Sequence, residues 1–140
     1  MQKNFEGKIV FPSTVTEKLN DTVLNQALGL SAEERQELVI SYAEKANEIW
    51  VVQGAEGFIM LEDKDSVRLP LFPHHDLASR FVDENGITGK CVSIPLDEFT
   101  ATWLPGLETN GVELVMFPTK SDAENLVMTA NDLAAEFKGE

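Results

Sequence analysis

The first part of the chain carries the hydrophobic spacing of helices. Apolar residues recur at roughly helical intervals over residues 15–28, and Gly29 then offers a left-handed stop. Ser31 and Glu34 match a capping box, and apolar residues separated by charged ones follow them at helical spacing. We therefore expect one or two helical pieces that end near Gly29, followed by a helix at about 32–47.

Residues 49–72 instead carry the spacing of strands. Residues that favour strands fill 49–52 and 58–61 on either side of a glycine-containing turn, which predicts a hairpin. A second turn leads into 67–72, where apolar residues alternate on one face. Because Pro70 has no N–H to donate, we expect this strand to lie at a sheet edge or to stop pairing there.

The second half alternates helices and strands. The expected elements are a short helix from Asp76 to Asn85-Gly86, a strand at 90–94, a helix from Leu96 that Pro105-Gly106 breaks, strands at 112–117 and 126–128, and a final helix capped by Thr129. In the strand at 90–94, either Val92 and Ile94 or Cys91 and Ser93 point inward, and we favour the first pair. This order predicts a two-layer α+β fold: one mixed, mainly antiparallel sheet with helices packed on it.

The length of 140 residues suits one domain, and neither an internal repeat nor a linker is visible. We treat residues 1–27 as an amino-terminal extension, in which Ile9-Val10-Phe11 forms a short strand or an arm ahead of a helix. No apolar run is long enough for a membrane span or a secretory signal, and Cys91 is the only cysteine. We therefore expect a cytoplasmic protein without disulfides.

Charge narrows the possible partners. The chain has 24 acidic and 11 basic residues, which gives a net charge of -13. Such a surface repels phosphate backbones, so we expect no nucleic acid among its partners. Because no apolar run could span a membrane, we expect no membrane among them either. Solubility alone would explain the charge, but an acidic surface also complements a basic protein.

Several segments centred on proline or tryptophan resemble a small bacterial family, domain of unknown function 2750, over about residues 28–138. These segments are Leu30-Ser31-Ala32-Glu33-Glu34-Arg35, Ile49-Trp50, Leu69-Pro70-Leu71-Phe72-Pro73-His74, Ile94-Pro95-Leu96-Asp97-Glu98-Phe99, Trp103-Leu104-Pro105-Gly106-Leu107 and Val115-Met116-Phe117-Pro118-Thr119. The resemblance implies a cytoplasmic protein and carries over no activity or catalytic residue. From Trp50 onward the element order also resembles, more weakly, the amino-terminal domain of the serine-sensitivity-enhancing protein SseB. The extension lies outside both resemblances.

Loops that follow strands are where a sheet of this kind would hold a ligand. The junctions Pro73-His74 and Pro118-Thr119 follow predicted strands, while Asp97 and Trp103 add a carboxylate and an aromatic ring. The candidate binding residues are Pro73, His74, His75, Asp97, Trp103 and Pro118. The alternative is a purely structural role: the aromatic residues belong to the core, and the Asp97 carboxylate interacts with the positive end of a helix dipole.

None of these residues completes a known catalytic set. His74 and His75 are adjacent in sequence, so they diverge and do not easily share one metal ion. We expect no cofactor and no metal, and a non-catalytic domain that binds an unknown protein, in its sharpest form as an immunity-like or inhibitor-like protein against a basic partner. The alternative is a small hydrolase or ligand-binding enzyme that uses His74, His75, Cys91 or Asp97 around one strand-end cleft. The chain is expected to be a monomer, or a homodimer formed through an edge strand near Pro70.

Overall fold

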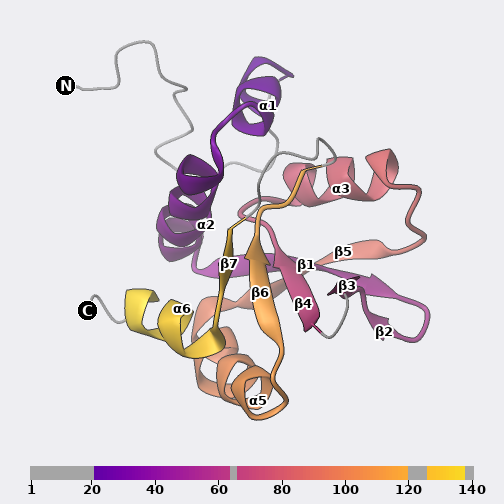
Figure 1. The fold of residues 1–140 in the computed structure, drawn as a ribbon. Coiled ribbons are helices and arrows are strands. Elements are labelled where there is room, and N and C mark those ends of the chain that lie inside the picture. The colour runs from indigo at the N-terminus through magenta and orange to yellow at the C-terminus, as the bar shows by residue number, and fades with distance from the viewer. Residues whose placement is uncertain (1–20, 64–65, 120–125, 138–140) are drawn as a thin grey trace, which may run out of the picture.

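The computed structural model describes residues 21–63, 66–119 and 126–137, in which helices surround two small sheets (Figure 1). The elements are α1 (Asp21–Leu28), α2 (Ala32–Ala46), β1 (Glu48–Gly54), β2 (Gly57–Phe58), β3 (Leu61–Asp63), β4 (Ser66–Leu71), α3 (His75–Glu84), β5 (Lys90–Pro95), α4 (Leu96–Glu98), the π-helix η1 (Phe99–Trp103), α5 (Leu104–Thr109), β6 (Glu113–Met116), β7 (Val127–Met128) and α6 (Ala130–Phe137). The strand or arm expected at residues 9–11 lies outside the described residues.

The strands confirm the α+β class but divide into two sheets. One has the order β2-β1-β5 and is antiparallel, and the other has the order β3-β4-β6-β7 with only β4 and β6 parallel. The strand expected at 58–61 is interrupted at Ile59-Met60, so β2 closes the hairpin with β1 while β3 pairs with β4. A bridge between Trp50 and Phe72, whose N–H and C=O groups exchange two hydrogen bonds of 3.0 Å, joins the two sheets.

Pro70 occupies an internal strand, so the expected edge position is wrong. β4 lies between β3 and β6, and Pro70 is aligned with Val115 of β6. Its nitrogen points away from β6, because the neighbouring Leu71 directs its C=O toward β6 and Phe72 directs its polar groups toward β1. On the side of β4 that faces β3, pairing has already ended at Arg68. This agrees with the second expectation, that pairing stops near Pro70. The homodimer expected through an edge strand near Pro70 stays a prediction.

Helices cover both faces of the β2-β1-β5 sheet. Trp50, Val52 and Cys91 share one face, because Val52 is aligned with Cys91 and side chains alternate along a strand. α3 lies over this face, where the His75 ring contacts Trp50. The opposite face carries Phe58, against which Trp103 of η1 packs at a ring distance of 4.8 Å.

The helix beginnings follow their predicted caps. At α2 the Glu34 N–H donates to Ser31 Oγ and the Ser31 N–H donates to Glu34 Oε1, which confirms the capping box. At α6 the Asp132 N–H donates to Thr129 Oγ1. Each cap satisfies N–H groups that have no partner within their own helix.

Pro105-Gly106 does not break the helix that begins at Leu96, contrary to the prediction. Pro105 has no N–H and its ring would clash with the C=O four residues earlier in a regular α-helix. The chain widens into η1 just before it, and the Leu104 N–H donates to the Phe99 carbonyl five residues back. The helical path therefore continues through α5.

One cluster of buried hydrophobic residues joins the two sheets and the helices. Its aromatic centre is Phe72, whose ring lies 5.2 Å from Phe81 and 6.3 Å from Phe117. Phe72 and Phe117 are fully buried, as expected of core residues, whereas Trp50 and Trp103 are half-buried at the margin. Among the described helices, none has the length and hydropathy that crossing a membrane requires.

Candidate functional site

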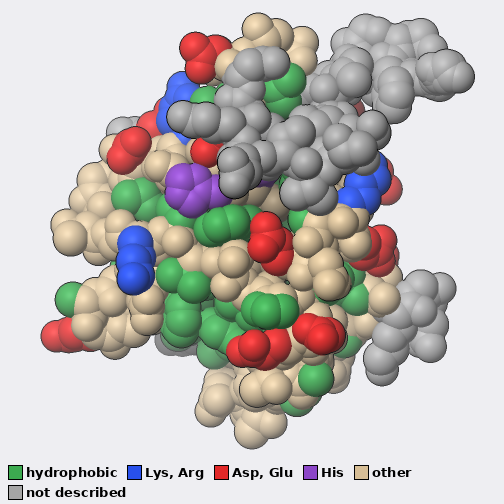
Figure 2. Space-filling view, turned by 180° about the vertical axis from the view of Figure 1, so that it is seen from behind, with side chains coloured by type: hydrophobic (Ala, Val, Ile, Leu, Met, Phe, Trp, Pro, Cys, Tyr) green, Lys and Arg blue, Asp and Glu red, His purple; other side chains and the backbone are tan. Residues whose placement is uncertain are grey.

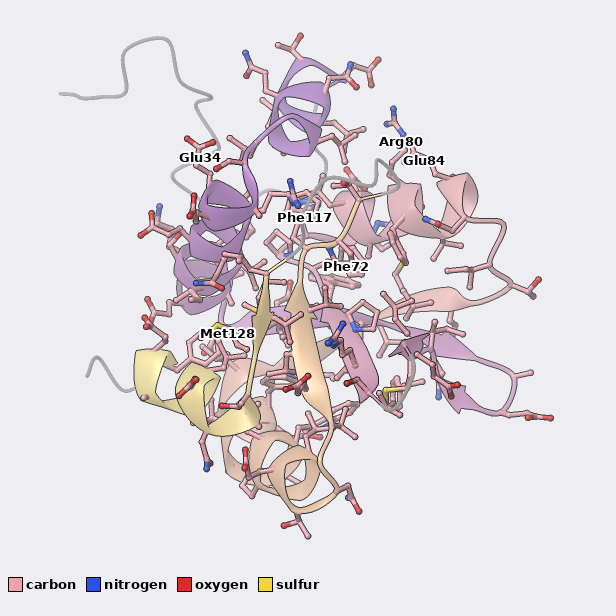
Figure 3. All side chains as sticks on the ribbon, in the orientation of Figure 1. Glu34, Phe72, Arg80, Glu84, Phe117 and Met128 are labelled. Carbon is pink, nitrogen blue, oxygen red and sulfur yellow. The ribbon has the colours of Figure 1, made fainter. Side chains whose placement is uncertain are left out.

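The carboxyl ends of β4 and β6 lie side by side. The two strands are parallel, with Leu71 aligned with Met116, and the Phe117 N–H donates to the Leu71 carbonyl at 2.8 Å. The segments that follow, Pro73-His74 and Pro118, therefore leave the sheet at the same edge. Figure 3 shows Phe72 and Phe117 close together at this end of the sheet. Of the six candidate residues, the structure brings these three and His75 to one region.

A buried arginine fixes the backbone beyond β6. Phe117 has a φ of 52°, which costs a non-glycine residue of order 1–3 kcal/mol. Arg35 of α2 donates from Nε to the Phe117 carbonyl at 2.9 Å and from Nη1 to the Leu30 carbonyl at 2.7 Å. The side chain is 2% exposed, and burial lowers the pKa of the guanidinium from its usual value.

Sequence reasoning missed Arg35, although a signal for its burial exists. Arg35 precedes Val39 by four residues, and Tyr42 and Ala43 continue the same helical stripe. All three hydrophobic residues are buried, so Arg35 belongs to the buried face of α2. A charged residue on such a stripe indicates a structural hydrogen-bonding role.

His74 forms the N-terminal cap of α3. Its Nδ1 accepts a hydrogen bond of 3.0 Å from the Asp76 N–H, and the residue is 4% exposed. Its ring lies 6.0 Å from that of Tyr42 on α2. One nitrogen of this imidazole is thus committed to capping the start of α3.

His75 points away from His74 and toward solvent. Its ring meets Trp50 edge-on at 5.2 Å, and its Nδ1 lies 3.1 Å from Asp76 Oδ1. The side chain is 49% exposed. The two adjacent histidines therefore point into different environments, as expected for neighbours in sequence.

Asp97 and Trp103 belong to a different part of the molecule. Asp97 is exposed on α4, where its Oδ1 accepts the Glu98 N–H at 2.7 Å. Trp103 packs on Phe58 and stacks on Phe99 at 5.9 Å. Both residues thus have local structural contacts that do not involve the β4 and β6 ends.

Cys91 has an environment that suppresses the thiolate. Burial, followed by the negative charges of Asp83 and Asp76 on α3, raises the pKa of this half-buried thiol. A catalytic cysteine needs the opposite shift. No group of three or more His, Cys, Asp or Glu side chains suited to a metal ion occurs in residues 21–63, 66–119 and 126–137.

A groove of about 590 Å³ between the α4-η1-α5 segment and α6 was missed by sequence reasoning. α5 and α6 lie side by side in the lower part of Figure 1. The lining residues are Thr100, Ala101, Leu104, Pro105, Glu108, Asn131, Ala134 and Phe137. The groove depends on small side chains, Ala101 and Ala134, on two helices whose pairing the sequence alone does not reveal.

These features define a small acidic α+β domain with a structurally fixed strand-end region and a separate surface groove. The chain belongs to the family described as protein of unknown function (DUF2750), whose model matches residues 36–137. This confirms the family resemblance over a slightly shorter span than expected. None of the curated proteins matches the chain. The weaker resemblance to SseB stays a prediction.

Proposed function

We propose that this protein is a non-catalytic interaction domain that binds a basic protein through its acidic surface, in the manner of an inhibitor or immunity protein. The proposal rests on one observation, the imbalance of exposed charge over the described residues. The exposed acidic residues are Asp21, Glu33, Glu34, Glu37, Glu44, Glu56, Glu62, Asp83, Asp97, Glu98, Glu108, Asp132 and Glu136. Acidic side chains are spread over the face drawn in Figure 2.

The basic residues of the same segments do little to offset this charge. Arg35 is buried, and Arg68 and Arg80 form ion pairs with Glu113 and Glu84 at 3.4 and 3.0 Å. Lys45 and Lys90 are the exposed basic residues within the described part of the chain. Over the described residues, the surface therefore carries many more exposed acidic side chains than exposed basic ones.

A surface of this kind favours a partner of opposite charge. Complementary charge steers the two proteins together and raises the association rate, whereas a polyanion is repelled. The side chains named for the alternative enzyme also support the proposal. His74, His75 and Asp97 each make a local contact that caps or packs a neighbouring element. The lone Cys91 fits a reducing compartment, so we place this function in the cytoplasm.

The test is affinity capture from the source cell at low salt, followed by titration of each captured protein in purified form. We expect at least one basic partner, whose dissociation constant rises steeply with NaCl concentration. The triple variant Glu33→Gln/Glu37→Gln/Glu44→Gln should slow association without changing the fold. The proposal fails if no purified protein reproduces the binding, or if the binding is insensitive to salt.

A further inference from the structure

The groove between the α4-η1-α5 segment and α6 has an apolar interior. Leu104 forms a buried floor, and the exposed Ala101 and half-buried Ala134 leave space above it. Phe137 and Pro105 add apolar surface at the sides. Small residues on two facing helices leave room that a larger side chain of another molecule can fill.

A hydrogen bond sets the relative position of the two helices at one end of the groove. Glu108 Oε1, near the end of α5, accepts the N–H of Asn131, near the start of α6, at 3.2 Å. Thr100 and Phe137 line the groove farther along the two segments. The span from residue 100 to residue 108 corresponds to about 12 Å of helix, or roughly two turns.

The two segments that form the groove carry acidic residues and no basic ones. Residues 96–109 and 130–137 contain no Lys, Arg or His. Their acidic residues, all exposed, are Asp97, Glu98, Glu108, Asp132 and Glu136. Of these, Glu108 lines the groove. An apolar channel with a carboxylate at one end, built by segments without basic residues, complements a helix with one apolar face and lysine or arginine on its flanks.

We infer that this groove is the docking site for a basic amphipathic helix of the partner, an inference that rests on the proposed function. Apolar side chains spaced three or four residues apart enter between Ala101 and Ala134, and a flanking basic side chain lies near Glu108. A second copy of this chain is a poorer occupant, since it would bring two surfaces of the same negative charge together.

The probe is a synthetic peptide of about four helical turns, with leucine at helical spacing and lysine elsewhere, compared with a scrambled peptide of the same composition. Binding is measured by fluorescence anisotropy, and amide chemical shifts map the contact. We expect the amphipathic peptide to bind more tightly than the scrambled one, with shifts concentrated in residues 100–108 and 131–137.

Two pairs of variants distinguish peptide binding in the groove from nonspecific attraction to the negatively charged surface. Ala101→Phe fills the groove and should weaken peptide binding by at least about tenfold, whereas Thr102→Phe, at a neighbouring exposed position outside the lining, should leave it unchanged. Glu108→Gln should weaken binding and its salt dependence more than Glu37→Gln on α2. Ala134→Phe is the second filling variant if Ala101→Phe melts at a lower temperature.

Equal binding of the two peptides overturns the inference. Equal effects of Ala101→Phe and Thr102→Phe, or shifts that lie outside the groove, overturn it as well. In each of these cases the proposed function stands, because a basic protein can bind another acidic face. Only the capture and titration experiment decides the proposed function.

Discussion

At the scale of single residues, Arg35 makes the most consequential contact of the strand-end region. Its guanidinium joins α2 to the buried carbonyl of Phe117 and to the partly buried carbonyl of Leu30. Arg35→Met removes both donors at once and leaves polar groups unsatisfied, so we expect the free energy of unfolding to fall by about 3 kcal/mol. Urea denaturation measures the change.

Arg35→Lys is the matched control for this prediction. Lysine keeps the positive charge but lacks the planar fork that reaches two carbonyls, so its loss of stability should be smaller than that of methionine. A decrease below about 0.5 kcal/mol for Arg35→Met, the range of ordinary surface substitutions, would contradict the assigned role.

Cys91 gives a pH-dependent prediction. Because burial and the carboxylates of Asp83 and Asp76 raise its pKa, the reactive thiolate is scarcer at neutral pH than in a free cysteine. Alkylation by iodoacetamide should therefore be slow at neutral pH and accelerate only on the alkaline side. Asp83→Asn removes one like charge, lowers the pKa and moves the pH–rate curve to lower pH. Glu37→Gln, on α2, should leave the curve in place; an unchanged curve for Asp83→Asn would disprove the electrostatic coupling.

At the scale of elements, local patterns predicted most helices and strands, and long-range pairing explains the errors. The capping box of α2 and the cap of α6 lie within four residues, so the sequence displays them in full. The edge position expected for Pro70 and the helix break expected at Pro105 were wrong, because a proline is tolerated where its surroundings need no N–H. At Pro70 pairing with β3 has already ended, and before Pro105 the chain forms the π-helix η1, so neither proline removes an N–H that is needed.

The difference between local patterns and long-range pairing also explains which candidate site residues come together. The rule that loops after strands gather at one sheet edge correctly associated Pro73 and His74 with Pro118, because β4 and β6 are parallel. Asp97 and Trp103 lie apart from them because nothing local specifies which face of a sheet a following helix covers. The groove was missed for a related reason, since Ala101 and Ala134 meet only after α5 and α6 pair.

At the scale of the whole molecule, the net charge of -13 opposes folding as well as attracting partners. Raising NaCl from about 10 to about 150 mM shortens the Debye length from about 30 to about 8 Å and screens this repulsion. We expect the thermal denaturation midpoint to rise by about 3 °C, which corresponds to roughly 1 kcal/mol for a chain of this size. The triple variant Glu33→Gln/Glu37→Gln/Glu44→Gln should melt higher at low salt and gain less from added NaCl. A midpoint that falls with salt would mean that attractive ion pairs, such as that of Arg80 with Glu84, outweigh the repulsion between the exposed carboxylates.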